Sequence, residues 1–587
     1  MSQPQLHLAE APPRQTVPPP AAADRPARTG LAPRARPRDH FWTRGEPLVW
    51  ASGGALAVVL LAALGMLAVV LRNGLGVFWP AALAEVTLVD GTRLVGVPVQ
   101  AETNPDNGRR QIQFKTANRE LQPGRQDFRW VTDDDVLETR YPAELMVLER
   151  TNNGDFYGTL REVRTPDLNL PEDVDPAERL ALALGQVAAV RATKLRPVAE
   201  QITAAGDRQQ RLQHAIARIA YRKQAAAAAG EADADALAQL DAQQQSLEAQ
   251  QAEVHQETQR LVGRAGRLET SLRENVAVFD DAQAVPRTIP LADIVRCYQP
   301  NAMGLWAKID HYLAKLWELL STQPRESNTE GGLLPMIFGT VTLIFLMAAG
   351  CFPLGVLAGI YLGEYARDGW LVRLVRVGVN NLAGIPSIVY GVFGLGFFIY
   401  GLGRAVDRWC FPEMLAEGTP VFGTGGVLWA SLTLGLLTVP VVIVATEEAL
   451  RVVPRGIREG SYALGATKLQ TLVRVLLPMA SPGILTGFIL AMARAAGEVA
   501  PLMLTGVIKL APVLPLDGRF PYLHLDRQFM HLGFHIFDLA FQSPNAEASR
   551  PMVFVATLLL LAIVLSMSGL AIWCRQRMVK RLRLRMM

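Results

Sequence analysis

The chain has 587 residues, half of them hydrophobic, and a formal net charge of +4. This length exceeds that of a single domain, and the small charge, without a basic and aromatic pattern suited to bases, argues against nucleic-acid binding. Apolar runs of about 18 or more residues indicate a membrane protein.

Residues 1–46 are rich in proline, alanine and arginine and have no apolar periodicity. This composition predicts a disordered basic tail. The first membrane span follows at about Leu48–Leu71, within residues 47–72. Its apolar run is longer than the ~7–15-residue core of a signal peptide, so we expect an uncleaved anchor. The arginine-rich tail places the N-terminus in the cytoplasm.

Residues 77–330 form a soluble insert. Val86–Val95 reads as a β-hairpin with an Asp90-Gly91 turn. Further strands are predicted at Gln111–Lys115, Phe128–Val131, Glu144–Leu148 and Phe156–Val163, with a returning strand at Ile289–Cys297. The insert is therefore expected to be an α+β domain.

A helical hairpin interrupts these strands at about residues 195–276. Apolar residues occupy heptad a and d positions on the first arm, and leucine or valine recurs every seven residues on the second. The residues are Leu195, Val198, Ile202, Ala205, Leu212, Ile216, Ile219, Ala226, Leu240, Leu247, Val254, Leu261 and Leu268. The pattern predicts an antiparallel coiled coil whose arms of ~35 residues reach ~50 Å. A solvated spacer and a docking arm are equally compatible with it.

Five more spans are predicted in residues 331–587. They are Leu333–Leu362, Val377–Leu402, Gly426–Ala445, Pro482–Val507 and Pro551–Cys574. Arginine is concentrated in the loops after spans two and four and in the C-terminal tail, so these segments are expected in the cytoplasm with both termini. The insert is then extracytoplasmic, in the periplasm. Cys297 and Cys410 would share that face, and the sequence does not decide whether they pair.

The loop at residues 446–481 contains a helix, a break and a second helix. Gly465 can take the left-handed conformation that ends the first helix. Leucine and valine then repeat at helical spacing until Pro478, which is expected to end the second helix. Ser481-Pro482 would begin the next span as N-cap and first-turn proline.

This loop resembles the EAA loop of ABC-importer permeases, in which Glu-Ala-Ala, three residues, Gly, nine residues and Ile-x-Leu-Pro follow in order. Glu459, Gly465, Leu477 and Pro478 match, Val475 replaces isoleucine, and Gly460-Ser461 replace the alanines. The resemblance implies that the loop docks into a groove of an ATPase subunit and transmits its motion.

Asn380–Gly391 opens the third predicted span. Small residues at four-residue spacing, including Ser387, allow close helix approach. Pro386 frees a backbone carbonyl, and irregular backbone at membrane depth is tolerated where it lines a cavity. Asn381 and Ser387 are therefore candidates for the translocation path, with a kinked packing helix as the alternative.

Arg494 and Glu498 lie in the fifth predicted span, where a charge is costly unless it is paired or hydrated. They are four residues apart, so they are expected to share a helix face and to pair. One interpretation is a structural ion pair. In the other, Arg494 lines an anion path and Glu498 prevents it from trapping the substrate.

His531 and His535 are spaced i, i+4 near Asp526 and Asp538. This spacing could ligate a metal, but no third ligand is indicated, so an interfacial amphipathic helix is favoured and no metal site is predicted. The sequence has no Walker A motif, nucleophile elbow or paired catalytic carboxylates.

Tyr361–Ala366, Asn380–Gly391 and Ala493–Leu502 resemble the A-type permease subunits of bacterial phosphate ABC transporters, the PstA family, from about Gly331 to the C-terminus. The insert is similar to the long N-terminal extension of some members. Charged residues in that family at positions matching Arg494 and Glu498 favour the anion-path interpretation.

The resemblance implies an all-α, six-span type I ABC importer permease in the inner membrane, not an enzyme. Its implied partners are a second permease subunit (PstC-like), an ATPase subunit (PstB-like) and a phosphate-binding protein (PstS-like). ATP would bind the partner, so no cofactor is expected in this chain. A permease for sulfate or molybdate and a membrane-anchored sensing scaffold are the alternatives.

Overall fold

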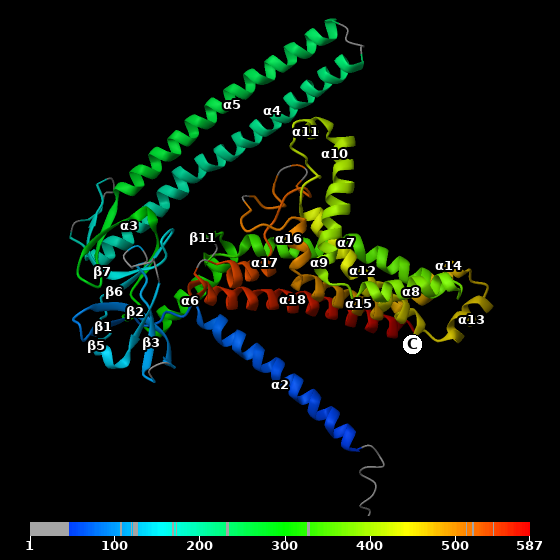
Figure 1. Cartoon of the computed structure of the whole chain (residues 1–587), viewed down its shortest axis with the longest axis horizontal. Helices are drawn as coiled ribbons and strands as arrows, with labels where there is room; N and C mark the ends of the chain where they lie inside the picture. The colour runs from blue at the N-terminus through cyan, green and yellow to red at the C-terminus, as the bar shows by residue number, and fades with distance from the viewer. Residues whose placement is uncertain are drawn as a thin grey trace, which may run out of the picture. The chain divides into compact units, whose positions relative to one another are not determined.

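Figure 1 shows the computed structural model of the chain. It describes residues 46–105, 108–118, 120, 127–166, 170–171, 173–229, 234–325, 329–511, 513–518, 520, 522–543 and 545–586. The tail predicted for residues 1–46 lies outside these residues except for its last position. The chain divides into two units, residues 1–66 and 67–587, with α2 (Glu46–Gly76) running across the division.

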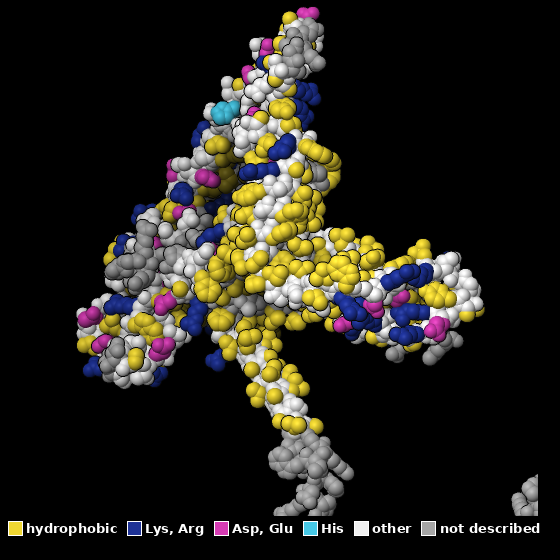
Figure 2. All heavy atoms as spheres, turned by 45° about the vertical axis from the view of Figure 1, so that its right-hand side comes forward, with side chains coloured by type: hydrophobic (Ala, Val, Ile, Leu, Met, Phe, Trp, Pro, Cys, Tyr) yellow, Lys and Arg dark blue, Asp and Glu magenta, His cyan; other side chains and the backbone are white. Residues whose placement is uncertain are grey.

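Six helical segments among the described residues are long and apolar enough to cross a membrane. They are Leu48–Gly76, Leu334–Tyr365, Ser387–Cys410, Val427–Arg451, Lys468–Gly497 and Ala546–Lys580. The predicted number of spans is confirmed, although several boundaries differ. Figure 2 shows hydrophobic side chains exposed over long stretches of these helices, as lipid-facing surfaces require.

The helical core is centred on α12 (Val427–Arg451), which packs against α7 (Leu334–Ile360) and α15 (Leu477–Gly497). Small residues bring the backbones close together. The Cys351 side chain occupies the space beside Gly435, and a Cβ on Gly487 would lie 2.3 Å from the Ala445 Cβ. Larger side chains at these two glycines would therefore separate the helices.

The third span begins ten residues later than predicted. α8 (Trp370–Leu382) is a separate helix, and the spanning helix starts with α9 (Ser387–Phe393) and continues through a π-helical segment (Gly394–Gly403) into α10 (Arg404–Cys410). Pro386 has no N–H to donate to the Leu382 carbonyl and keeps the preceding residue out of helical geometry. The predicted start of the span at Val377 was wrong for this reason, whereas the irregular backbone expected at Pro386 is present.

The fifth span also differs from its prediction at both ends. α15 ends at Gly497, Glu498 is extended (φ −80°, ψ 128°), and the short α16 (Ala500–Thr505) follows. Pro501 cannot donate to the Gly497 carbonyl, and its ring would clash with that carbonyl in a continuous helix. The uninterrupted span predicted to Val507 was therefore wrong.

The prediction that Pro478 ends a helix was wrong as well. The helix runs without interruption from α14 (Lys468–Thr471) through a π-helical turn (Leu472–Leu476) into α15. Pro482 leaves the Pro478 carbonyl without its helical donor, and the Ser481 hydroxyl donates to that carbonyl at 2.8 Å. A neighbouring hydroxyl thus satisfies the group that the proline frees, so Ser481 is not an N-cap.

The insert contains two five-stranded antiparallel sheets with the same topology (Figure 1). The first has the order β4-β3-β2-β1-β5 and the second β9-β8-β7-β6-β10. The first sheet comprises β1 (Ala84–Leu88), β2 (Arg93–Thr103), β3 (Arg110–Lys115), β4 (Phe128–Thr132) and β5 (Val136–Arg140). The second comprises β6 (Leu145–Arg150), β7 (Phe156–Arg164), β8 (Val276–Asp280), β9 (Pro286–Pro290) and β10 (Ile294–Tyr298). In each sheet a short 3₁₀ turn precedes the last strand, which pairs with the first.

The two sheets are a tandem repeat. Gly96 on β2 and Gly158 on β7 occupy equivalent positions, where an added Cβ would lie 2.7 Å from the Lys115 carbonyl oxygen and 2.5 Å from the Asp280 carbonyl oxygen. The segments 129–142 and 287–300 align without a gap, with Arg, Asp and Pro at the same places. The predicted single strand Ile289–Cys297 is two strands separated by the turn Leu291–Asp293, and β5 and β8 were not anticipated.

Two long helices leave the second sheet between β7 and β8. α3 (Pro176–Val190) leads through a π-helical turn into α4 (Arg196–Ala229), and α5 (Ala234–Glu274) returns. The ion pairs Lys223–Asp241 and Arg208–Glu257 link the two helices and show that they run antiparallel. We call α4 and α5 together the arm.

An ion-pair cluster joins the second sheet to α6 (Leu305–Ser321), the helix before α7. Lys315 Nζ lies 2.5 Å from Glu149 and 3.6 Å from Glu318. Arg296 contacts both carboxylates, and Arg325 contacts Glu318 at 2.6 Å. Burial raises the pKa of the Glu149 carboxyl, and this effect exceeds the lowering effect of Lys315. Three cationic side chains share two carboxylates at this junction, so the charges form one network.

Candidate functional site

Two interrupted spans meet inside the helical core. The first interruption separates α8 from α9, and the second separates α15 from α16. α9 packs against α16, and a Cβ on Gly391 would lie 2.8 Å from the Pro501 Cα. Ile385 and Tyr390 share a hydrophobic cluster with Ala495. The two breaks therefore border one region, with irregular backbone at membrane depth of the kind that lines a cavity.

Arg494 lies in the last turn of α15, and its Nε is 3.6 Å from Glu498 Oε1. The expected pairing is present, but Glu498 lies beyond the helix end, so the two do not share a helix face. Their side chains are 35% and 20% exposed. An arginine and its counter-charge are thus held at the second break, partly accessible from the surface of this single chain.

Tyr390 connects Arg494 to the first break. Arg494 is close enough to Tyr390 to interact with it electrostatically, and the Tyr390 hydroxyl donates to the Leu382 carbonyl at 2.7 Å. That carbonyl is the one Pro386 leaves without a helical donor. Tyr390 had no role in the sequence analysis. The signal that could have identified it is its position one helical turn after Pro386, from which its hydroxyl can reach back to the Leu382 carbonyl.

Ser387 and Asn381 lie on opposite sides of the first break. Ser387 is half-buried and is the first residue of α9, where the positive end of the helix dipole lies. The Asn381 side chain is exposed, and its carbonyl accepts from Gly384 N–H at 3.0 Å. Ser387 therefore borders the break at a helix N-terminus, whereas Asn381 contributes to it through its backbone.

A cavity of about 150 Å³ lies between α8 and α12, next to Asn380. Arg376 Nε is 2.9 Å from Glu447 Oε1, and Arg451 contacts the same oxygen at 2.5 Å. One carboxylate thus holds two arginines and attaches α8 to α12. The sequence reasoning used these arginines only for topology.

The loop at residues 446–481 forms a helical hairpin. α13 (Arg455–Ala463) has Leu464 as its C-cap, and Gly465 follows with a φ of +81°. Nothing lies within 4 Å of an added Gly465 Cβ, so backbone conformation alone selects glycine there. Thr467 is the N-cap of α14 and forms a capping box with Gln470. The Thr467 hydroxyl accepts from Gln470 N–H, and the Gln470 side-chain oxygen accepts from Thr467 N–H.

Arg458 anchors the hairpin to the helical core. Its Nη2 lies 2.6 Å from Glu364 Oε1 and donates to the Leu450 carbonyl at 2.6 Å, while Nη1 donates to the Val453 carbonyl at 3.1 Å. Glu364 follows α7, and Leu450 lies at the end of α12. α13 is therefore bonded directly to the ends of two core helices. The sequence reasoning counted Arg458 only as a cytoplasmic charge.

The hairpin exposes large apolar side chains. Leu464 is 90% exposed and Leu469 62%, with Val452, Tyr462 and Val473 also exposed. Glu459 is exposed, whereas Leu477 and Pro478 are half-buried at the start of α15. Figure 2 shows hydrophobic and basic side chains together at the end of the molecule that carries α13 and α14. Apolar side chains gathered in this way indicate a surface for another protein.

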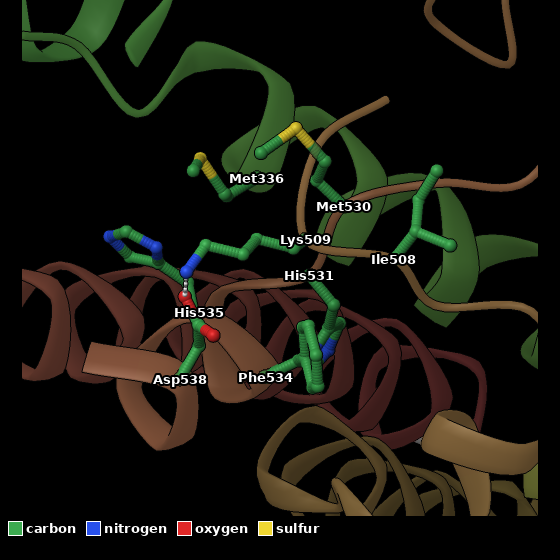
Figure 3. Close-up of a pocket in the computed structure, with 8 residues that line it drawn as sticks. All are labelled: Met336, Ile508, Lys509, Met530, His531, Phe534, His535 and Asp538. Carbon is green, nitrogen blue, oxygen red and sulfur yellow. Dashed lines mark ion pairs between the residues drawn. The ribbon is translucent and has the colours of Figure 1, made fainter. Parts of the chain in front are cut away.

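The histidine pair lies in a buried pocket beside α17 (Leu532–Phe537) (Figure 3). His531 Nδ1 accepts from Gly533 N–H at 3.1 Å, and Lys509 Nζ lies 3.0 Å from Asp538 Oδ2. Burial lowers the pKa of both His531 and His535 to about 4. The expected helix exists, but both histidines are buried, so the expectation of an amphipathic interfacial helix was wrong. Among the described residues, no three His, Cys, Asp or Glu side chains are grouped to hold a metal.

The four cysteines are free among the described residues, so Cys297 and Cys410 do not pair in this structure. Cys297 is half-buried with its Sγ 3.9 Å from Met146 Sδ, and Cys410 is exposed at the end of α10.

Comparison with known proteins agrees with this arrangement. Residues 355–580 match the family model described as "Binding-protein-dependent transport system inner membrane component". The phosphate transport system permease protein PstA of Yersinia pestis is 36% identical over 248 residues, which cover 42% of this chain and 74% of the relative. A probable phosphate transport system permease protein PstA of Methanocaldococcus jannaschii is 34% identical over 242 residues, covering 40% of this chain and 74% of the relative.

Among solved structures, an inward-facing MetNI methionine ABC transporter covers 46% of this chain and 97% of its own, at 20% identity and a TM-score of 0.29. That score is too low for the likeness to bear on the fold. The identity and coverage of the PstA relatives are high enough to establish the family, and the six apolar helices agree with a multi-pass membrane protein. The chain belongs to the PstA family of phosphate transport system permease proteins.

Proposed function

We propose that this chain is the permease subunit of an ATP-driven phosphate importer and forms part of its translocation pore. Membership of the PstA family supports the substrate class, and the meeting of two interrupted spans beside Arg494 is the structural observation that carries the proposal. Interrupted helices whose backbone groups face a midplane site are a recurrent way for transporters to bind charged substrates.

The proposed translocation path is lined by Arg494, Glu498, Ser387 and Asn381. An anion that crosses a low-dielectric core needs positive potential on its route, and the Arg494 guanidinium and the N-terminus of α9 supply it. Glu498 competes with the substrate for Arg494, because its carboxylate already lies 3.6 Å away. This competition keeps binding weak enough for the anion to leave.

The hairpin α13–α14 is the coupling element, with Glu459, Gly465, Leu477 and Pro478 as its matching residues. Its exposed apolar side chains fit the groove of an ATPase subunit, and the Arg458 bonds carry a displacement of α13 to α7 and α12. ATP binds that partner subunit, so this chain supplies no cofactor site. A second permease subunit completes the pore, and a phosphate-binding protein delivers the anion.

The basic segments set the orientation in the inner membrane. In this proposal α8, the hairpin segment and both termini lie in the cytoplasm. The orientation is supported by Arg373 and Arg376 on α8 and by Arg455, Arg458 and Arg474 on the hairpin segment. The tandem sheets and the arm then lie in the periplasm.

Phosphate uptake by a strain that lacks its own permease tests the proposal. The chain, expressed with its partner subunits, should restore uptake of labelled phosphate, and excess sulfate or molybdate should not compete. Restored uptake of sulfate or molybdate without phosphate would assign the permease to another oxyanion. A chain that assembles with no partner and restores no transport would instead support a membrane-anchored scaffold.

A further inference from the structure

The arm is not surrounded by solvent along its whole length. α4 packs against α11 (Pro412–Ala416), a short helix between the third and fourth spans, and the two lie side by side in Figure 1. Arg218 Nε is 3.3 Å from Glu413 Oε1. Glu413 and Met414 are buried, and so is Ala217, the residue before Arg218. The contact therefore has an apolar part and an ion pair.

α11 belongs to a firmly bonded segment, residues 404–426, that we call the outer cap. Asp407, which is fully buried, accepts from Phe422 N–H at 2.8 Å and from Gly423 N–H at 2.6 Å. The Trp429 indole donates to the Phe422 carbonyl at 2.7 Å and ties the cap to α12. These charge-assisted bonds to a buried carboxylate are strong, so the outer cap moves as one piece.

The outer cap also contacts the end of α16. Gly426 N–H donates to the Thr505 carbonyl at 3.1 Å, and an added Cβ on Gly425 would lie 3.0 Å from the Gly506 Cα. α16 begins at Ala500, two residues after Glu498. A continuous set of contacts therefore joins the arm, the outer cap, α16 and the break that holds Arg494.

We propose that the arm is a brace on the outer cap, released from α11 each time the translocation path opens. A shift of α16 at its break must move the outer cap, because the cap is bonded to the end of that helix. The Arg218 side chain is 58% exposed and that of Glu413 is 9% exposed. Solvent reaches the guanidinium and screens the pair from that side, so separating it costs less than separating a fully buried pair. Packed elements with two discrete arrangements are the means by which such movements are transmitted.

Reversible cross-linking in the assembled transporter tests the proposal. Arg218→Cys and Glu413→Cys are combined in a Cys410→Ser background, because Cys410 is exposed at the end of the neighbouring α10. A short thiol-reactive linker with an internal disulfide is added to membranes from outside. We expect peptides around positions 218 and 413 to be found joined by mass spectrometry, most phosphate uptake to be lost, and uptake to return after reduction.

The control combines Glu413→Cys with Glu253→Cys, an exposed position on α5. It should give no joined peptides and no loss of uptake with the same reagent. Absence of joined peptides in the 218 and 413 variant, in a complex that transports phosphate, would show that the contact does not form. Joined peptides with unchanged uptake would show that the contact is never released, and would overturn the brace. Loss of uptake in this test rests on the proposed function, whereas the joined peptides report the contact whatever the transporter carries.

Discussion

Removing the charge of Arg494 separates a transport role from a structural one. With 3.6 Å between its Nε and Glu498 Oε1, the Coulomb energy at an effective dielectric of about 20 is about 4 to 5 kcal/mol. About a third of the Arg494 side chain is exposed, so solvent screening leaves about 2 kcal/mol. Glu498→Gln should therefore lower the amount of assembled transporter modestly, because it leaves a partly buried cation without its counter-charge.

The effect of Arg494→Gln on transport should be larger. A unit charge about 5 Å from the anion, at the same dielectric, contributes about 3 kcal/mol, which corresponds to about a hundredfold in rate. We expect uptake to fall by about that factor at normal levels of complex. The double replacement should recover the protein level that Glu498→Gln loses, but it should not recover uptake.

The assay is initial phosphate uptake at matched protein levels. Arg577→Gln, which removes another exposed arginine at the end of the last span, is the control and should transport normally. Near-normal uptake by Arg494→Gln would show that other residues, such as those of a second permease subunit, supply the positive potential. Restored uptake in the double variant would reduce the pair to a structural role.

Three further predictions concern coupling, topology and pH. Gly465→Val should sharply reduce uptake while membrane insertion persists, because a β-branched residue is strained by about 1–3 kcal/mol at a φ of +81°. Gly456→Val, in α13 outside the matched motif, where an added Cβ also meets open space, should have less effect, and equal losses would remove the argument from the left-handed turn. In a background without exposed cysteines, Glu253→Cys should react with an impermeant thiol reagent from outside and Gly465→Cys only after permeabilisation; the reverse pattern would refute the orientation. Burial lowers the folded-state pKa of His531 to about 4 from 6.5, so below pH 6.5 the unfolded chain binds the proton that the folded chain excludes. Its stabilisation is complete above pH 6.5 and should decrease by about 3 kcal/mol towards pH 4. Thermal unfolding against pH measures this loss. His531→Gln should make the profile less steep, with the remaining slope due to the buried His535, whereas His255→Gln on the exposed face of α5 should leave it unchanged. Identical profiles for the two variants would contradict the burial argument.

The sequence by itself determined the number of spans and the position of the hairpin α13–α14, because these depend on local properties. Each span needs a long apolar run, and each predicted run overlaps one of the six apolar helices. Gly465 was identifiable because a left-handed residue between two helical patterns is a local requirement. Most strands of the insert were found for the same reason, since the Asp90-Gly91 turn and its flanking residues identify a hairpin without reference to the rest of the chain.

The tandem repeat was less accessible from the sequence. The arm separates β7 from β8, so the two halves of the second sheet lie more than a hundred residues apart and no fixed period appears. The equivalence of Gly96 and Gly158 is apparent only from the structure, in which each glycine lies against the backbone of the third strand of its own sheet, β3 or β8. The contact between Arg218 and Glu413 is similarly non-local, and heptad spacing alone left a spacer and a docking arm equally acceptable.

The candidate site depends on the backbone at three prolines, which only the tertiary structure reveals. Pro482 lies inside a continuous helix, and the preceding Ser481 donates its hydroxyl to the carbonyl that the proline frees. Pro501 follows an alanine, and there the helix ends and Glu498 becomes extended. At Pro386 the freed Leu382 carbonyl is satisfied by Tyr390 from the next helix, which fixes the break beside Arg494. A proline removes one backbone hydrogen bond. The surrounding structure decides whether the helix continues, as at Pro353 and Pro440, or breaks, as at Pro386.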